Sequence, residues 1–331
     1  MTLSITSTIQ GGVSSASCVD RLPHDRSHLL CNAEGVPRPT KLFQSSIRRW
    51  VGAHLSDDSA TDGSLGDVVE GVVISKSSGV FCGRLPVDLL ISEWFPSCDL
   101  KWNVEEGEGI VAGSQILSIS GPSDSVLSCE RVMLNVLGRM SGISTRASEW
   151  VNESGAISIA CTRKTAWGLM DKWAVHVGGG LTHRLSRADA LMIKENDLSV
   201  IFSKGGPKSA ISYAISAIDF EKSASFAIIE VQDSSQAISA AEAWSENQKI
   251  RGGRERIVIL LDNMGPYECG SAELLLRESG LREWCILEGS GGVTLDGLHT
   301  WIESSRVDVI SSSSINMGVP SLDLSMLIGG I

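Results

Sequence analysis

The second half of this chain repeats a short apolar segment followed by a longer segment of helical periodicity, and this alternation is the strongest constraint on the fold. Six such repeats run from about residue 156 to the C-terminus. The first is AISIACT at 156–162 followed by WGLMDKWAVHV at 167–177, and the last apolar segment is VDVISSS at 307–313. Because crossover helices join parallel strands, the pattern predicts a parallel α/β barrel or a doubly wound sheet.

Polar residues stand where several of these apolar segments end, and this favours the barrel. They are Arg163–Lys164, Lys194–Glu195–Asn196, Glu230 and Gln232, Asp262–Asn263, Glu288–Gly289–Ser290 and Ser311–Ser314. In a parallel barrel the C-terminal ends of the strands converge on one mouth, where such folds keep their active sites. We therefore expect a single site assembled from residues that are far apart in the sequence.

The stretch from Cys161 to Asp197 is a basic island in an acidic protein whose formal net charge is -11. Its basic residues are Arg163, Lys164, Lys172, His176, His183, Arg184, Arg187 and Lys194. Any one of them alone is typical of a surface charge. Like charges gathered at successive strand ends, however, repel each other unless an anion or carboxylates offset them. The island therefore indicates an anion-binding site.

Two glycine-rich turns and one aspartate leave structural and functional interpretations open. Gly178–Gly180 fits a helix C-cap or a close backbone approach to a ligand. Ser290, Gly291 and Gly292 separate a strand from a helix, where exposed N–H groups cradle phosphate, or they form a plain connector. Asp262 ends a strand and fits ribose or Mg²⁺ binding as well as an Asx turn.

The first part of the chain predicts a smaller, separate unit. Residues 1–40 mix Ser, Gly, Pro and Asn without periodicity, so we expect a flexible N-terminal arm. Helical spacing follows to about residue 53, and residues 55–121 alternate β-branched runs with Gly and Ser, as strands and turns do. From residue 122 the spacing predicts a helix that bridges the two parts and is interrupted near Ser141–Gly142.

Composition excludes several classes of protein. No apolar run approaches the roughly 18 to 20 residues that span a bilayer, which excludes a membrane protein. The Ser/Thr-rich start lacks the features of a secretory signal, and it fits a frayed extension or an organellar transit peptide. The eight cysteines form no C-x-x-C pair, which argues against a zinc site or disulfide framework and predicts reduced thiols in the cytoplasm. An acidic chain is also a poor partner for nucleic acid.

Five collinear segments resemble the quinolinate phosphoribosyltransferases, also called nicotinate-nucleotide pyrophosphorylases (carboxylating). They are ERVMLNVLGRMSGIST, TRKTAWGLMDKWAVHVGGGLTHRLSRADALMIKEN, LLDNM, EGSGGVTLDGL and VDVISSSSI. The match runs from about residue 60 to the C-terminus, and the TRKT…GGG…HR…IK series is specific as a series. The resemblance implies an N-terminal α/β sandwich domain at 41–121, completed by part of the C-terminal tail. It also implies an incomplete TIM-like barrel within 122–331, together with the bridging helix.

The resemblance also implies a reaction and a set of site residues. Quinolinate and phosphoribosyl pyrophosphate would give nicotinate mononucleotide, pyrophosphate and CO₂ with Mg²⁺, in a homodimer or higher even oligomer. The implied quinolinate-binding residues are Arg131 of the neighbouring subunit, with Arg163, Lys164, His183, Arg184 and Lys194 of the same chain. The implied ribose- and phosphate-binding residues are Glu230, Gln232, Asp262, Ser290, Gly291, Gly292 and Ser313. Lys164, Lys194 and Asp262 are the implied catalytic residues, and Asp262 is also the candidate Mg²⁺ contact.

The chain departs from the family pattern at several positions. The family usually has Asp where this chain has Cys161, Asn at Thr182, and IKDNH where the chain has Glu195 and Asp197. The second carboxylate of its EVE motif is here Gln232, which accepts a hydroxyl hydrogen bond without a full negative charge, and a usual Gly is Ser313. Two alternatives therefore stay open. One is a relative acting on another aromatic acid, as in the molybdenum-transport branch, which typically lacks the Lys at 194, and the other is a non-catalytic homologue that keeps the anion pocket.

Overall fold

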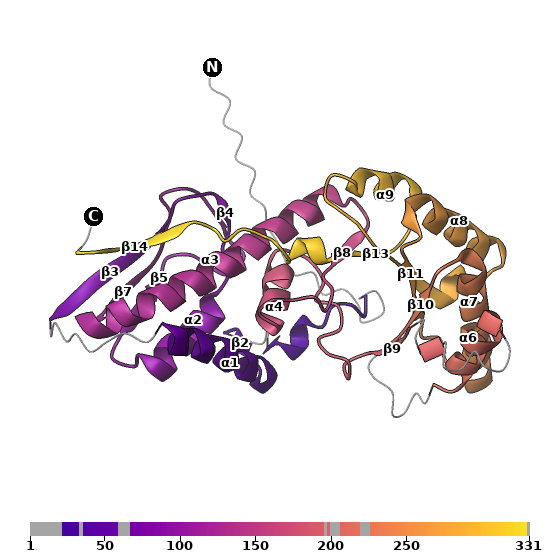
Figure 1. Cartoon of the computed structure of the whole chain (residues 1–331), viewed down its shortest axis with the longest axis horizontal. Helices are drawn as coiled ribbons and strands as arrows, with labels where there is room; N and C mark the ends of the chain where they lie inside the picture. Colours follow the sequence, from indigo (N-terminus) through magenta and orange to yellow (C-terminus); the bar gives the residue numbers. More distant parts are fainter. Residues whose placement is uncertain are drawn as a thin grey trace, which may run out of the picture.

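The structure is a computed structural model, and it describes residues 22–32, 36–58, 67–194, 197–198, 206–218 and 226–329. Two parts lie side by side, a small antiparallel sheet with its helices and a larger parallel α/β part, and one long helix runs between them (Figure 1). In the part of the chain that the structure describes, no helix is both long and apolar enough to span a membrane.

The larger part is built on a six-stranded parallel sheet in the order β8-β13-β12-β11-β10-β9. Its strands are β8 (Ser158–Ala160), β9 (Leu191–Ile193), β10 (Ala227–Val231), β11 (Ile257–Asp262), β12 (Cys285–Ser290) and β13 (Val309–Ser311). The outer strands β8 and β9 do not pair with each other within the described ranges, so the barrel is open between them. The prediction of an incomplete parallel barrel is confirmed.

Helices cover the outside of this sheet. The helices of this part are α4 (Leu169–Val177), α6 (Gly206–Ser216), α7 (Ser234–Arg251), α8 (Gly265–Glu278) and α9 (Leu298–Ser304), and the 3-10 turn η3 (Arg282–Trp284) precedes β12. A second 3-10 turn, η4 (Ser313–Ile315), follows β13 at the carboxyl ends of the strands. β11 is almost entirely buried, which is what a strand covered on both faces requires. The Asp233 side chain caps α7 by accepting the Gln236 N–H, and Gly252 ends this helix in the left-handed conformation.

The smaller part is an antiparallel sheet in the order β14-β3-β7-β5. Its strands are β3 (Val68–Ser75), β5 (Asp99–Trp102), β7 (Gln115–Pro122) and β14 (Leu324–Ile328), beside the short pair β4 (Gly79–Val80) and β6 (Gly109–Ile110) and the helices α1 (Lys41–Asp57) and α2 (Arg84–Trp94). β14 comes from the C-terminal end of the chain and pairs with β3, as Figure 1 shows in yellow. The chain therefore returns from the barrel to complete the first sheet.

The bridging helix α3 (Ser123–Glu153) is continuous over 31 residues, so the predicted interruption near Ser141–Gly142 is wrong. Both residues serve packing instead. The Ser141 hydroxyl bonds to the backbone of Cys82, and a Cβ at Gly142 would lie 2.2 Å from the carbonyl oxygen of Pro320. The small residues therefore let the returning C-terminal segment cross the helix closely.

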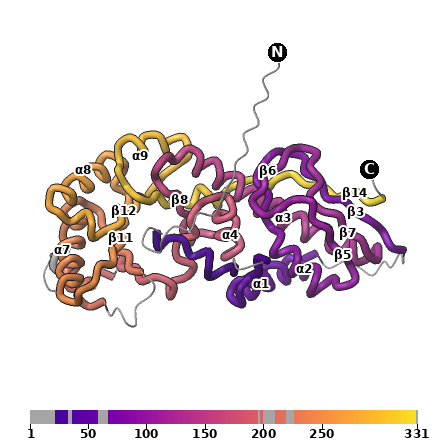
Figure 2. Tube along the Cα trace, turned by 180° about the vertical axis from the view of Figure 1, so that it is seen from behind, coloured from indigo at the N-terminus to yellow at the C-terminus, as the bar shows by residue number. Residues whose placement is uncertain are grey.

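The N-terminal segment from Leu22 to Asn32 packs against the barrel, although the sequence predicted a flexible arm over 1–40. It forms η1 (Ser27–Leu29) and β1 (Cys31–Asn32), and β1 pairs with β2 (Arg38–Pro39). Leu22 packs against a cluster inside the barrel that includes Phe226 and Ile228. An incompletely closed barrel leaves apolar side chains that need cover, and this segment supplies it (Figure 2). Residues 1–21 and 33–35 lie outside the described ranges.

Candidate active site

A cavity of about 610 Å³ opens at the carboxyl ends of the barrel strands. It is lined by most of the residues that the sequence singled out: Arg163, Lys164, His183, Arg184, Lys194, Glu230, Asp262, Ser290, Gly291, Gly292 and Ser313. Most of these residues come from the ends of the six strands or the loops after them, and His183 and Arg184 come from the loop between α4 and β9. The convergence follows from the parallel sheet, because every carboxyl end points to the same side.

One side of the cavity is cationic. Arg163 and Lys164 follow β8 and are exposed, and Lys194 follows β9 directly. The Lys194 ammonium lies 2.7 Å from a carboxylate oxygen of Glu230, and Glu230 lies on the neighbouring strand β10. Half of the Lys194 side chain is exposed, so the ammonium stays accessible to an anionic ligand while Glu230 orients it.

Arg184 is the buried member of this cationic side. Its guanidinium donates to the carbonyl oxygen of Ala190, and only 6% of the residue is exposed. Burial lowers the pKa of Arg184, and the positive charges of Arg163 and Arg187 lower it further. A guanidinium held under such repulsion gains the most from an anion that neutralises it.

His183 is held by hydrogen bonds at both ring nitrogens. The Arg184 N–H donates to Nδ1 at 2.7 Å, so Nδ1 carries no proton and Nε2 carries it. Nε2 lies 3.1 Å from Glu288 and therefore donates to that carboxylate. Burial lowers the pKa of His183 against the opposing effect of Glu288, and its backbone has φ +52°. His183 thus ties the loop that carries Arg184 to Glu288 of β12 while it lines the cavity.

The opposite side of the cavity carries a carboxylate beside a glycine-rich turn. The Asp262 carboxylate accepts hydrogen bonds from the Ser290 hydroxyl at 2.9 Å and the Asn263 amide at 2.8 Å. Gly291 has φ +97°, and a Cβ there would lie 2.3 Å from the Asn263 side-chain oxygen. Only glycine allows the β11 and β12 loops to approach this closely. The result is a turn of exposed N–H groups beside the carboxylate.

The segment after β13 closes the floor of the cavity. The Ser312 N–H donates to the Ala160 carbonyl of β8, and the Ser312 hydroxyl donates to the Val293 carbonyl. Ser313 begins η4 and lines the cavity next to Ser314. A polar hydroxyl therefore lies at the position where the family pattern has glycine.

Two predicted site residues are not brought to the cavity, and one further segment is not described. Arg131 is exposed on α3, near the end that follows β7 of the small sheet, and Gln232 is exposed beyond β10 without lining the cavity. The Gln232 N–H instead meets the Gln236 side chain of α7. Glu195 and Asn196 lie outside the described residues. Asp197 is described, and its carboxylate accepts the Lys194 N–H.

Within the same stretch, Lys172 has a structural role that the sequence did not predict, and Gly178 has the helix-cap role that the sequence left open. Lys172 is only 2% exposed, and its ammonium donates to the carbonyl oxygens of Thr162 and Thr182. It thereby ties the end of β8 to the loop that carries His183. Gly178 caps α4, and a Cβ there would lie 2.3 Å from Ser144 of α3. The glycine run is therefore a helix cap at a close helix contact.

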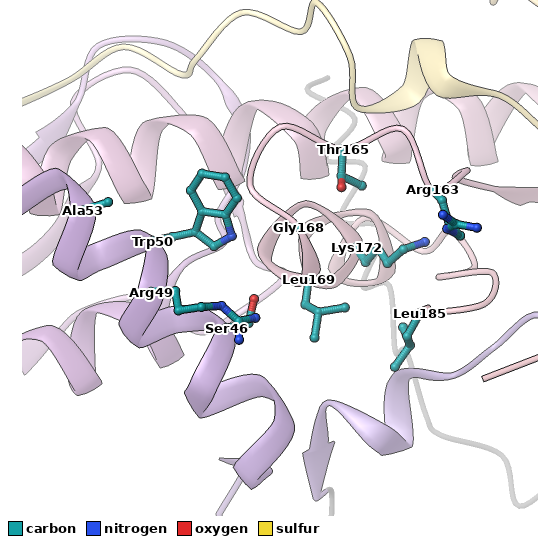
Figure 3. Close-up of a pocket in the computed structure, with 10 residues that line it drawn as sticks. All are labelled: Ser46, Arg49, Trp50, Ala53, Arg163, Thr165, Gly168, Leu169, Lys172 and Leu185. Atoms are coloured by element: carbon teal, nitrogen blue, oxygen red, sulfur yellow. The ribbon is translucent and has the colours of Figure 1, made fainter. Parts of the chain in front are cut away.

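A second cavity of about 460 Å³ lies beside the first and shares Arg163 with it. Figure 3 shows Arg49 and Trp50 of α1 on one side, and Arg163, Thr165 and Lys172 on the other. Helix α1 of the smaller part thus forms one wall of this second cavity, which is basic and lies next to the carboxyl ends of the barrel strands.

The acidic residues of the larger cavity fit a magnesium ion. Mg²⁺ prefers oxygen ligands and is usually held by one or two carboxylates together with substrate phosphates. A carboxylate accepts about four hydrogen bonds or metal contacts, and Asp262 uses two of them in the described structure. Asp262 therefore retains the capacity to contact a metal ion.

Comparisons with known proteins agree with this geometry. The chain matches the family models "Quinolinate phosphoribosyl transferase, N-terminal domain" over residues 58–141 and "C-terminal domain" over 143–327. It is 31% identical over 294 residues to a probable nicotinate-nucleotide pyrophosphorylase [carboxylating] of Methanothermobacter thermautotrophicus, covering 86% of this chain and 98% of that protein. It is 35% identical over 264 residues to the Archaeoglobus fulgidus protein of the same name, covering 78% and 93%.

A solved structure shares the fold. The crystal structure of NadC from Streptococcus pyogenes superposes with a TM-score of 0.73 at 27% identity, covering 87% of this chain and 98% of that one. Both family models together span most of the sequence, in the order in which the two parts of the fold occur. The chain belongs to the quinolinate phosphoribosyl transferase family.

Proposed function

We propose that this protein transfers the phosphoribosyl group of phosphoribosyl pyrophosphate to quinolinate, with decarboxylation, to form nicotinate mononucleotide in NAD biosynthesis. The observation that carries the proposal is the division of one cavity into two chemically different sides. Cations at the ends of β8 and β9 face a carboxylate and a glycine-rich turn at the ends of β11 and β12. A dicarboxylate fits the first side, and a sugar phosphate fits the second.

The cationic side would receive quinolinate through its two adjacent carboxylates. Arg163 offers the fork geometry that suits a carboxylate, and Lys164 and Lys194 act as point charges. The lowered pKa of Arg184 supports an anion at this position, since an anion would restore its ordinary value. Orientation of the ring by these groups would direct the pyridine nitrogen toward the ribose side.

The ribose side would hold phosphoribosyl pyrophosphate with its C1 atom toward the pyridine nitrogen. The nitrogen attacks C1 as the C1–O bond to pyrophosphate breaks, through an oxocarbenium-like state. Glu230 and Asp262 line the cavity, and their negative charges would stabilise that state. The N–H groups of Gly291 and Gly292 suit a phosphate.

Decarboxylation would follow on the new pyridinium. The 2-carboxylate leaves as CO₂, its bonding electron pair stays on C2 next to the positive ring nitrogen, and a proton then replaces it. This chain's cations hold the remaining 3-carboxylate in place. The sequence needs no covalent bond between enzyme and substrate. Mg²⁺, which Asp262 would help to hold, supplies charge neutralisation for the pyrophosphate.

We also propose that a second subunit completes each site, and that the protein works in the cytoplasm. Arg131 is exposed on α3 and distant along the fold from the cavity of its own chain, which suits a contribution to a partner's site. A twofold dimer would exchange this residue in both directions. The free cysteines of the described chain suit a reducing compartment.

Turnover with matched substrates tests the proposed reaction. The purified protein, phosphoribosyl pyrophosphate and Mg²⁺ are incubated with quinolinate or with nicotinate, which lacks the 2-carboxylate, and mononucleotide is measured by chromatography. We expect product from quinolinate and at least about tenfold less from nicotinate, because a missing carboxylate leaves cations of the site, including the buried Arg184, without their anion. Tight quinolinate binding by calorimetry without any product would instead support the non-catalytic alternative.

A further inference from the structure

His24 lies inside the barrel, although it precedes every residue that the family models match. Its side chain is fully buried, and its Nε2 atom lies 2.9 Å from a carboxylate oxygen of Glu288. The ring also stands edge-on to His183, with the ring centres 5.1 Å apart. A residue from outside the matched region therefore touches a side chain that lines the proposed active site.

Glu288 is the centre of this contact. It is fully buried at the end of β12, and His24, His183 and the Ser311 hydroxyl all lie within hydrogen-bond distance of its carboxylate. A buried carboxylate is stable only when such donors surround it. The two histidines hold the pKa of Glu288 well below its ordinary value, against the effect of burial, so it stays ionised. Each of the three donors therefore shares in holding one negative charge.

The hydrogen bonds fix which atoms carry protons. His183 Nδ1 accepts the Arg184 N–H, so its Nε2–H must donate to Glu288. His24 Nε2 faces the same acceptor and is also a donor. Two histidines and one glutamate are a common set of metal ligands, and their ligand atoms lie within 4.8 Å of one another. In the described structure the two rings and the carboxylate form a hydrogen-bonded cluster.

The segment that carries His24 also binds the loop by hydrogen bonds and an ion pair on both sides of His183 and Arg184. On one side, the Thr182 hydroxyl accepts the Arg26 N–H at 2.8 Å and bonds to the His24 carbonyl at 3.2 Å. On the other side, the Arg26 guanidinium lies 3.0 Å from Asp189, whose carboxylate accepts the Leu185 N–H. The loop is therefore tied to the N-terminal segment before and after its two site residues.

We propose that His24 is a positioning residue of the active site, which holds Glu288 and through it sets the place of His183 and the Arg184 loop for quinolinate. The proposal rests on the proposed function, because it assigns quinolinate to the side of the cavity that Arg184 lines. The positive φ of His183 supports it, since a backbone in that conformation needs surrounding bonds to persist.

Three variants test the role of His24. His24→Leu removes the donor, His24→Gln keeps an N–H at a similar reach, and His28→Leu makes the same change at an exposed position of the same segment. KM is measured separately for quinolinate and phosphoribosyl pyrophosphate, with thermal unfolding alongside. We expect His24→Leu to raise the KM for quinolinate by about tenfold or more, the scale of a displaced binding group. We expect the KM for phosphoribosyl pyrophosphate to stay unchanged, and His24→Gln to restore most of the loss.

A purely structural role would give another result. Partial unfolding of His24→Leu would lower the apparent kcat with both KM values unchanged, and that outcome overturns the proposal, as does an equal effect of His28→Leu. If the wild-type protein shows no turnover, the proposed function fails separately. Nitrogen-15 NMR of the histidine side chains then tests which ring nitrogens of His24 and His183 carry protons. A proton on Nε2 of both rings supports the arrangement, and a proton on Nδ1 of His183 overturns it.

Discussion

Gly291→Ala is expected to damage the ribose-phosphate side of the site selectively. A Cβ at this position would lie 2.3 Å from the Asn263 side-chain oxygen and 2.8 Å from the Asn263 Cα, so rotating the side chain alone cannot relieve the clash. The backbone φ of +97° adds strain for any residue with a Cβ. The loops after β11 and β12 must therefore move apart, and they carry Asp262 and Ser290.

The expected loss in the free energy of unfolding of Gly291→Ala has two components. Alanine at a positive φ costs about 1 to 2 kcal/mol, and forcing an atom into a packed contact costs about 1 to 3 kcal/mol. Gly292→Ala is the matched control, because Gly292 also has a positive φ of +63° but a Cβ there meets nothing within 4 Å. We expect the two variants to differ in their free energies of unfolding by about the packing component alone.

Urea unfolding and steady-state kinetics check the expectation together. Gly291→Ala should raise the KM for phosphoribosyl pyrophosphate and lower its kcat/KM by up to about 100-fold, the effect of a shift of about 1 Å in a binding group. The KM for quinolinate should change little. Equal stabilities of the two alanine variants would show that the loops do not approach as the structure has them.

Four further expectations follow from the site. Lys194→Ala should raise the KM for quinolinate by about 10-fold to 100-fold in direct binding and kinetic assays, because a charge-assisted hydrogen bond contributes about 1.5 to 3 kcal/mol; an unchanged KM would place the carboxylate elsewhere. At a quinolinate concentration too low for either variant alone to turn over, mixing Arg131→Ala and Lys194→Ala subunits should restore about a quarter of wild-type activity if a twofold dimer shares its sites. A mixture that stays inactive under these conditions rules out a shared site. The pKa of His183 is lowered in the folded state, so below its ordinary value of 6.5 the unfolded state binds more protons than the folded state. The free energy of unfolding should therefore fall as the pH drops below about 6.5. It should fall again below 4.5, the ordinary pKa of Glu288, because the folded pKa of Glu288 is also lowered. A pH-independent stability between 7 and 4 would contradict this. Gln232→Glu should change kcat by less than about threefold, because Gln232 is exposed and does not line the cavity; a large gain would instead identify this position as the cause of weak catalysis.

The strand ends of the barrel could be predicted from the sequence because a parallel sheet brings every carboxyl end to one side. Apolar runs such as RIVILLDN therefore placed Asp262 near Lys194 without any knowledge of contacts. The prediction of a helix break at Ser141–Gly142 was wrong because small residues have two effects on helices. They weaken an isolated helix, but here they let the Pro320 backbone cross it.

The role of the N-terminal segment could not be predicted from the sequence. His24 and Glu288 are 264 residues apart, and the segment around His24 shows no periodicity. The segment packs against a barrel that is open between β8 and β9. That opening arises from the tertiary fold and leaves no pattern in the local sequence. Composition alone therefore indicated an arm where the structure has a packed segment.

The fate of the two carboxyl carbons of quinolinate tests the proposed reaction most directly. The protein is supplied with phosphoribosyl pyrophosphate, Mg²⁺ and quinolinate labelled with carbon-13 at either the 2-carboxyl or the 3-carboxyl group. We expect label from the 2-carboxyl group in CO₂, in equal amount to nicotinate mononucleotide, and label from the 3-carboxyl group only in the mononucleotide. Folded protein that binds quinolinate and releases no CO₂, or that releases the 3-carboxyl carbon, would contradict the account.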